Sequence, residues 1–154
     1  MSEEKLVAKI AAEYVGRETG LGEPLEIEKG AVRRFAEAIF DGNNPLYRDA
    51  DFASQTIYGG IPMPPAFLTT NMPSGSERDF DIPLPLTRRV RGGDELIFYR
   101  PIKVGDTIRA NTRILSIEEK EGRSGKMIFI TTETNYYNQH GELCMTNKVT
   151  VVKR

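Results

Sequence analysis

The second half of the chain contains four apolar runs that are rich in β-branched and aromatic residues. They are DELIFY (94–99), TIRANTRILSI (107–117), KMIFITTETNYY (126–137) and ELCMTNKVTVV (142–152). Residues of these types favour strands, and each turn between the runs supplies at least one glycine, the residue that most easily adopts a positive φ. Because the links are short, neighbouring runs should pair. The pattern predicts four long antiparallel strands.

The run at 107–117 also predicts which of its side chains face the core. Apolar or small residues at 108, 110, 112 and 114 alternate with Arg109, Asn111 and Arg113. This period of two places one face of the strand on a core and the other in water. Leu115 and Ile117 break the phase. An extra residue in one strand reverses the faces that follow, so we expect a β-bulge here.

The first half of the chain predicts helices. Leu6, Ile10 and Tyr14 recur at four-residue spacing within 4–15, and a second apolar stripe runs from Val32 to a helix end near Phe40. A short apolar third helix should begin at Pro64-Pro65 and stop at Pro73. The expected class is α+β, a curved antiparallel sheet around a central helix. Other α+β folds also fit this pattern.

Length and charge narrow the class of protein. At 154 residues, one domain over residues 1–154 is expected. The net charge of -1 gives no basic field for nucleic acid, and no apolar run is long enough to cross a membrane. The start MSEEKLVAKIAAEYVGRE lacks the basic flank and apolar core of a signal peptide, so we expect a cytoplasmic protein.

The chain has one histidine, His140, and one cysteine, Cys144. A zinc cluster of the usual kind needs more His and Cys ligands than this, so no metal site is predicted. His140 lies in an Asn-Gln-His-Gly turn, where an exposed turn residue is expected. Cys144 lies between Leu143 and Met145 in a predicted strand and is expected to be a buried small hydrophobe.

The segment DGNNPLYRDADFA (41–53) follows the second predicted helix, and its Asn-Pro pair indicates an ordered turn or loop. Such polar loops often do no more than end a helix. This one resembles the signature of the MaoC-like family, the type 2 enoyl-CoA hydratases, which runs Gly-Asp-x-Asn-Pro-Leu-His followed by an Asp and a small residue. The matching positions are Asn44, Pro45, Leu46, Asp49 or Asp51, and Ala53.

Two further segments strengthen this resemblance. YGGIPMPPAFLTTNM (58–72) is similar to the family's glycine-containing turn and central helix, and RGGDELIFYRPIKVGDTIRANTRI (91–114) is similar to its sheet. Together the matches cover about residues 14–152. The resemblance implies a single hot-dog fold, dimerisation into a paired sheet, and an acyl-CoA or acyl-carrier thioester as substrate. The implied reaction is reversible hydration of an enoyl group, with no cofactor.

The chain departs from the signature at the two catalytic positions. Active members of the family carry an aspartate and a histidine where this chain has Gly42 and Tyr47. Hydration needs one group to take a proton from water and another to deliver a proton to carbon. Asp41 lies one residue upstream of the expected place, and Tyr47 has an ordinary pKa near 10, which makes it a weak base at neutral pH. Both are weak catalytic candidates.

This departure favours one of three hypotheses. The family includes double hot dogs and heterodimers in which a non-catalytic half widens the substrate tunnel, so the chain is expected to pair with a catalytic hot-dog subunit. Alternatively, it is a homodimeric hydratase that uses Asp41, Tyr47 or Asp49, or a non-catalytic acyl-CoA binder. A thioesterase is less favoured, because the segment from Pro64 to Met72 has no acidic residue.

By position in the motifs, the resemblance implies a set of residues along the substrate tunnel. They are Asn44, Tyr47, Tyr58, Gly59, Gly60, Pro65 and Phe67. For Tyr58 and Phe67, plain core packing is an equal alternative. The guanidinium groups of Arg88, Arg89, Arg91 and Arg100 are candidates for coenzyme A phosphates, although for each of them a solvated strand face is the favoured alternative.

Overall fold

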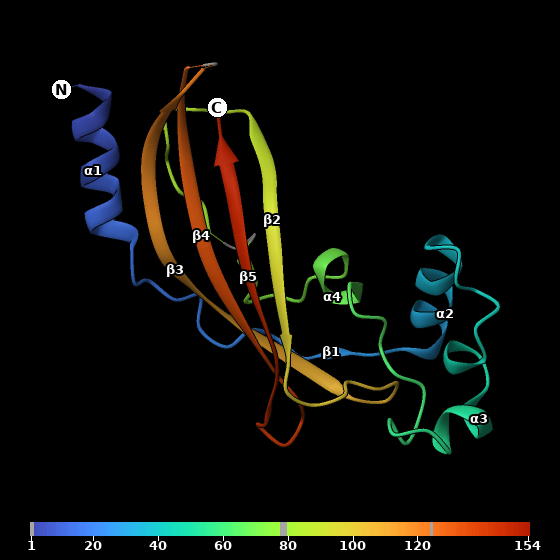
Figure 1. Cartoon of the computed structure of the whole chain (residues 1–154). Coiled ribbons are helices and arrows are strands. Elements are labelled where there is room, and N and C mark those ends of the chain that lie inside the picture. The colour runs from blue at the N-terminus through green and yellow to red at the C-terminus, as the bar shows by residue number, and fades with distance from the viewer. Residues whose placement is uncertain (1, 78–79, 124) are drawn as a thin grey trace.

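The computed structural model describes residues 2–77, 80–123 and 125–154, which form one curled antiparallel sheet with helices beside it (Figure 1). The strands are β1 (Leu25–Glu26), β2 (Arg89–Phe98), β3 (Thr107–Gly122), β4 (Gly125–Tyr137) and β5 (Leu143–Lys153), in the order β1-β3-β4-β5-β2. The four long strands that the sequence predicts are confirmed. Strand β3 pairs with β4 and β4 pairs with β5, and each pair is antiparallel.

Strand β2 begins earlier than the sequence predicts, at Arg89 instead of Asp94. It pairs with β5 at the edge of the sheet, and the register shifts between Arg91 and Gly93. Two consecutive glycines, at 92 and 93, are typical of a turn. In the structure they lie at the irregularity inside this strand. The added residues bring Arg89 and Arg91 into the sheet.

The predicted faces of β3 are confirmed. Ile108, Ala110, Thr112 and Ile114 are all buried, whereas Arg109 and Arg113 are exposed. The predicted bulge is also present, because the β3–β4 register shifts between Ile114 and Ser116. Burial then resumes at Ile117, three residues after Ile114, as an extra residue requires.

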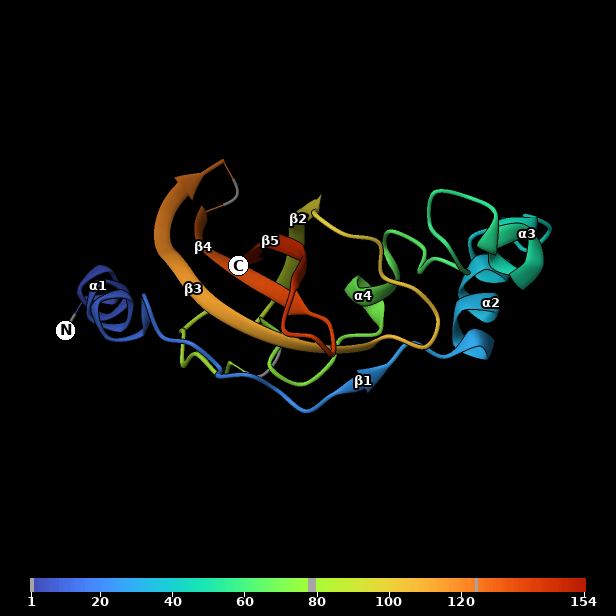
Figure 2. The same cartoon turned by 90° about the horizontal axis from the view of Figure 1, so that it is seen from below.

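Three helices flank the sheet. Helix α1 (Glu3–Tyr14) lies beside β3, whereas α2 (Lys29–Ala38) and α3 (Ala50–Ser54) lie at the opposite end of the molecule (Figures 1 and 2). The first two agree with the sequence within two residues. Two separate apolar clusters result: Val7 and Ile10 pack with Ile114 at one end, while Val32 and Ala36 pack with Ile108 at the other.

The expected central helix is shorter than predicted. Helix α4 is a single turn, Phe67–Thr70, instead of a helix through residue 72. The hydroxyls of Thr69 and Thr70 and the amide of Asn71 bond to carbonyls of the preceding turn, and Pro73 disfavours helical geometry at the residue before it. After this turn, Gly75 lies so close to the Ala110 carbonyl that a Cβ would lie 2.1 Å from its oxygen.

No helix within the described ranges 2–77, 80–123 and 125–154 is long and apolar enough to cross a membrane.

Candidate functional site

The segment 41–54 folds into two short helices, and two of its polar residues cap them. The Asn44 side chain accepts a hydrogen bond from the Leu46 N–H at 3.0 Å, at the start of a 3-10 helix, Pro45–Tyr47. The Asp49 carboxylate accepts from the N–H groups of Asp51 and Phe52, both at 3.0 Å, at the start of α3. These are the ordinary contacts of N-cap residues. Two residues of the signature therefore hold the loop in shape.

Gly42, where the motif resemblance predicts an aspartate in catalytic members, lies against the end of α2. A Cβ on this residue would lie 2.8 Å from Glu37 Cγ and 3.1 Å from Glu37 Cα. The loop thus lies so close to the helix that a side chain here would have to displace Glu37.

Asp41 is held beside this glycine. Its Oδ2 accepts a hydrogen bond from Asn44 Nδ2 at 3.1 Å, and its backbone N–H donates to the Ala36 carbonyl at 2.8 Å. The residue before it, Phe40, has a φ of 62° and a side chain that is 99% exposed. A positive φ is uncommon for phenylalanine, and at this helix end no burial of the ring compensates for it.

Tyr47, where the motif resemblance predicts a histidine in catalytic members, is largely buried. Burial raises its pKa above the usual value, and the nearby Asp41 and Tyr58 raise it further. The phenol therefore stays protonated at neutral pH, where it can donate a hydrogen bond, and even less of it is present as phenolate than in an ordinary tyrosine.

A mostly apolar pocket of about 380 Å³ opens beside Tyr47. One wall comes from the 46–65 region and the other from the end of β2 and the segment after it. The lining residues are Leu46, Tyr47, Tyr58, Pro62, Met63, Pro65, Phe98, Tyr99, Arg100, Pro101 and Ile102. Its size and lining are typical of a site for a small organic ligand.

Comparison with known proteins assigns the family. The model of the FAS1-like dehydratase domain region matches residues 13–147. The chain belongs to this family. It is also 31% identical over 148 residues to a UPF0336 protein of Thermobifida fusca, with 94% of each chain covered. A shorter match, 35% identical over 72 residues, covers 47% of the chain and 25% of the mesaconyl-C(4)-CoA hydratase of Chloroflexus aurantiacus.

Among solved structures, the truncated HadBC complex of Mycobacterium tuberculosis, a 3R-hydroxyacyl-ACP dehydratase, has a chain similar to this one. The TM-score is 0.76 at 21% identity, with 90% of this chain and 96% of that chain covered. This likeness confirms the predicted hot-dog fold. The resemblance to MaoC-like proteins that the motifs indicate is confirmed as well.

In this FAS1-like dehydratase domain, the predicted tunnel residues separate into two groups. Tyr47, Tyr58 and Pro65 line the pocket. The others lie around it: Asn44 caps the 3-10 helix, Gly59 and Gly60 lie against the Lys103 side chain, and Phe67 is buried in an edge-to-face contact with Phe35 at 5.5 Å.

The four predicted arginines also lie in different places. Arg100 lines the pocket, with its Nη2 3.5 Å from Glu142 Oε1. Arg91 lies elsewhere, between two carboxylates, because its Nε donates to Asp94 at 2.6 Å and its Nη1 to Glu77 at 2.7 Å. Arg89 lies 4.0 Å from Glu77, and Arg88 pairs through its backbone with Arg154.

Sequence reasoning did not assign the wall formed by Phe98, Tyr99, Pro101 and Ile102. Its signal was available, because Phe-Tyr-Arg-Pro directly follows the apolar run of a predicted strand. The remaining two candidates lie outside this pocket. His140 is in an exposed turn, and Cys144 is buried, with a thiol pKa that burial raises.

Proposed function

We propose that this chain is one subunit of an enoyl-thioester hydratase or (3R)-hydroxyacyl dehydratase, paired with a second hot-dog subunit that supplies the catalytic aspartate and histidine. The observation that carries the proposal is the structure around Gly42 and Tyr47. The first position is a glycine at which a Cβ would crowd Glu37, and the second holds a largely buried tyrosine whose pKa is raised. Neither can replace a catalytic pair that must exchange protons at neutral pH.

The reaction itself explains why two groups are needed. Hydration adds the oxygen of water to the β-carbon of the enoyl group while the α-carbon gains a proton. One group must take a proton from water, and another must deliver one to carbon. Dehydration reverses both transfers, and neither direction needs a bound cofactor. In the proposed complex the partner's aspartate and histidine perform these steps.

The contribution of this chain is substrate binding. The apolar pocket wall formed by Met63, Pro65, Phe98 and Ile102 suits an acyl chain, and the neutral phenol of Tyr47 suits a thioester carbonyl as hydrogen-bond donor. Arg100 is partly exposed at the same pocket, where its guanidinium can meet the phosphates of coenzyme A or of a carrier protein.

Strand β2 is the surface on which the second subunit would pair. It forms an edge of the sheet, and Val90, Ile97 and Phe98 along it are each about 40% exposed (39%, 43% and 44%). An open strand edge with apolar side chains favours addition of another strand. The similarity to a chain of the HadBC complex supports a two-subunit assembly.

Co-expression with a hot-dog protein that retains Gly-Asp-x-Asn-Pro-x-His tests the proposal. We expect a stable complex that hydrates an enoyl-CoA. Replacing the partner's aspartate or histidine should abolish turnover, and Arg100→Gln in this chain should raise KM about tenfold with little effect on kcat. Purification of two separate homodimers under these conditions would contradict the proposal.

A self-sufficient homodimer is the second candidate, and the proximity of Asp41 to Tyr47 favours it. The purified chain would then hydrate an enoyl-CoA by itself, and Asp41→Asn or Tyr47→Phe would abolish that activity. A third outcome, thermal stabilisation by acyl-CoA without turnover in any combination, would identify a binding protein instead.

A further inference from the structure

The amino end of helix α2 presents backbone N–H groups that lie outside the helical hydrogen-bond ladder. The helix begins at Lys29, and its first backbone bond runs from the Val32 N–H to the Glu28 carbonyl. The N–H groups of residues 29–31 precede that bond, and the Glu28 side chain forms no cap bond with them. The second of these residues, Gly30, adds no side chain that could cover them. Such a helix end favours an anion, because its N–H groups and the helix dipole both attract negative charge.

A cleft of about 370 Å³ opens at this helix end. Three cationic side chains line it, those of Lys29, Arg33 and Arg48, and Gly30 and Tyr47 complete the lining. Lys29 and Arg33 belong to α2, whereas Arg48 directly follows the 3-10 helix, so the cleft lies between these two elements. None of the five lining residues is acidic. We call this site the α2 cleft.

The cations of the α2 cleft are only partly neutralised. Arg33 Nε lies 3.7 Å from Glu37 Oε1, and because both side chains are more than half exposed, this ion pair is weak. Arg48 donates to a neutral oxygen, the Gly42 carbonyl, at 3.1 Å. Within residues 2–77, 80–123 and 125–154, neither Lys29 nor Arg48 forms an ion pair.

Other carboxylates of this region do not line the cleft. Asp41 accepts a hydrogen bond from Asn44, and Asp49 accepts two from the start of α3. Glu28, just before the helix, is also outside the lining. Even if Glu28 and Glu37 each offset one of the three cations, one positive charge remains at the cleft.

The Tyr47 hydroxyl is a further donor at the cleft. The residue is only 9% exposed, and its hydroxyl forms no hydrogen bond with any described part of the chain. Unlike Thr132 Oγ1, which burial hides completely, this hydroxyl keeps accessible surface. Buried polar groups usually have a partner, which can be a protein group, a water or a ligand. An unpartnered donor beside three cations therefore indicates a site for an anion.

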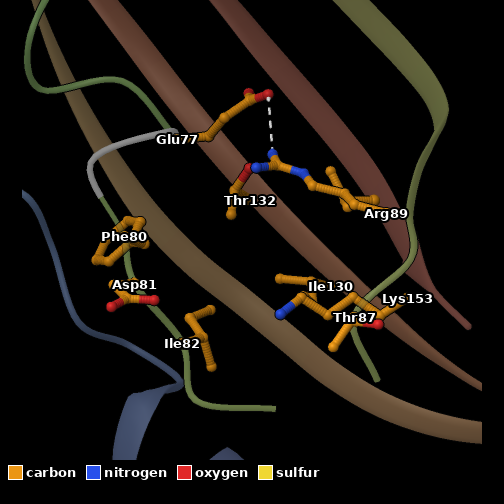
Figure 3. A pocket seen from close by; sticks show the side chains of 10 residues that line it. Glu77, Phe80, Asp81, Ile82, Thr87, Arg89, Ile130, Thr132 and Lys153 are labelled. Atoms are coloured by element: carbon orange, nitrogen blue, oxygen red, sulfur yellow. Dashed lines mark ion pairs between the residues drawn. The ribbon is translucent and has the colours of Figure 1, made fainter. Parts of the chain in front are cut away.

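The cavity between residues 80–87 and the ends of β2, β4 and β5 differs in this respect (Figure 3). There Arg89 extends toward Glu77, 4.0 Å away, and Arg91 binds the same carboxylate at 2.7 Å. Lys153 shares that cavity with Asp81. Cations and carboxylates are thus balanced in that cavity, whereas the lining of the α2 cleft contains cations without carboxylates.

We propose that the α2 cleft binds a phosphate group. The phosphate oxygens accept hydrogen bonds from the N–H groups at the start of α2 and from the Tyr47 hydroxyl, while Lys29, Arg33 and Arg48 supply positive charge. Phosphate suits this set because it has several acceptor oxygens, and because a guanidinium can bind two of them at once.

This binding does not depend on the proposed hydratase function, although Tyr47 also lines the apolar pocket. The hydroxyl has one proton to donate, so a phosphate in the cleft and a thioester in the pocket would compete for it. Phosphate binding is measurable on the chain alone. Its outcome is therefore separate from that of co-expression with a catalytic partner.

Titration of the chain with inorganic phosphate, followed through its backbone amide signals at constant pH and ionic strength, tests the proposal. We expect the signals of Gly30 and Ala31 to shift and to saturate at millimolar phosphate, because these N–H groups are the proposed donors. The signal of Gly93, in strand β2, should stay unchanged. Chloride at the same ionic strength should not reproduce the shifts. No shift at Gly30, or an equal shift with chloride, would overturn the proposal.

Variants locate the contacts. Lys29→Gln and Arg48→Gln should each weaken phosphate binding about fivefold, as expected for the loss of one exposed cation. Tyr47→Phe, which keeps the buried ring, should weaken it several-fold. Lys9→Gln is the matched control, because it removes the same charge from an exposed position on α1 and should leave binding unchanged. Equal weakening by Lys9→Gln would mean that net charge alone attracts phosphate, and would contradict a site at α2.

Two related molecules distinguish the source of the phosphate. Coenzyme A carries a phosphate monoester on its ribose that dephospho-coenzyme A lacks. A larger shift of Gly30 with coenzyme A would assign the cleft to the nucleotide end of a thioester carrier, an outcome that rests on the proposed function. Equal shifts, with inorganic phosphate still bound, would assign the cleft to a separate small phosphate ester.

Discussion

The Cα atom of Glu37 lies 3.1 Å from the place where a Cβ on Gly42 would be. Because of this close contact between the end of α2 and the loop after it, a side chain at position 42 would have to displace Glu37 or the loop. We expect Gly42→Asp to leave the purified chain without hydratase activity.

The same contact predicts a loss of stability. Gly42→Ala should lower the free energy of unfolding by about 1–3 kcal/mol, because the methyl group has no space beside Glu37. Urea unfolding measures it. Gly93→Ala is the matched control, since nothing lies within 4 Å of that position, and it should change stability by less than about 0.5 kcal/mol. Equal effects of the two changes would contradict this explanation.

Asp49 should stabilise the loop through its capping bonds. Asp49→Ala removes the acceptor of the Asp51 and Phe52 N–H groups and should cost about 1 kcal/mol. Asp49→Asn retains an acceptor oxygen and should cost much less. Thermal unfolding of the two variants compares them, and an equal loss in both would indicate that the negative charge, and not the cap, is what matters.

Phe40 offers a stabilising change. Its φ of 62° is costly for phenylalanine, and its side chain is 99% exposed, so no packing is lost on replacement. Asparagine tolerates this conformation better, and Phe40→Asn should raise the free energy of unfolding by about 1 kcal/mol. Ile57→Asn removes a side chain that is 92% exposed from a residue without positive φ and should not stabilise the protein. A loss of stability in Phe40→Asn would mean that the ring is packed in the free protein.

Asp94 should contribute to the acid sensitivity of the fold. Hydrogen bonds from Arg91, and more weakly from Asn147, lower its pKa in the folded protein. Its stabilising effect is therefore complete above the unfolded pKa of about 4 and is lost as the pH falls through the folded value. Urea unfolding at pH 6 and pH 3 should show a smaller loss of stability on acidification in Asp94→Asn than in the original protein. Identical pH dependence would show that Asp94 has no such role.

Much of the sheet could be predicted from local pattern. The alternation along 107–114 and its break at Leu115 reflect burial and a bulge, both of which act on neighbouring residues. Helix α4 could not be bounded in this way, because its end depends on bonds from Thr69, Thr70 and Asn71 that compete with further helical turns. The start of β2 is not evident from the sequence, because Gly92 and Gly93 interrupt the strand pattern and only pairing with β5 makes them part of a strand.

The candidate site is likewise predictable only where the order of residues along the chain determines it. Tyr47, Tyr58 and Pro65 could be placed near a pocket because the motif fixes their order along the chain. The sequence makes Arg91 a candidate for contacting a phosphate, yet it lies between Glu77 and Asp94. These two carboxylates come from different segments, and no local pattern shows that they converge on one guanidinium.

The open edge at β2 has a consequence for how the protein must be produced. In the proposed assembly this edge is covered by another subunit, so a chain made in excess would display Val90, Ile97 and Phe98 beside unpaired backbone groups. Synthesis of the two subunits in equal amounts would then keep the β2 edge covered on each chain. This covering would protect the fold as much as its own core does. A surplus of this chain would be lost to precipitation or proteolysis, and the level of its partner would set its abundance.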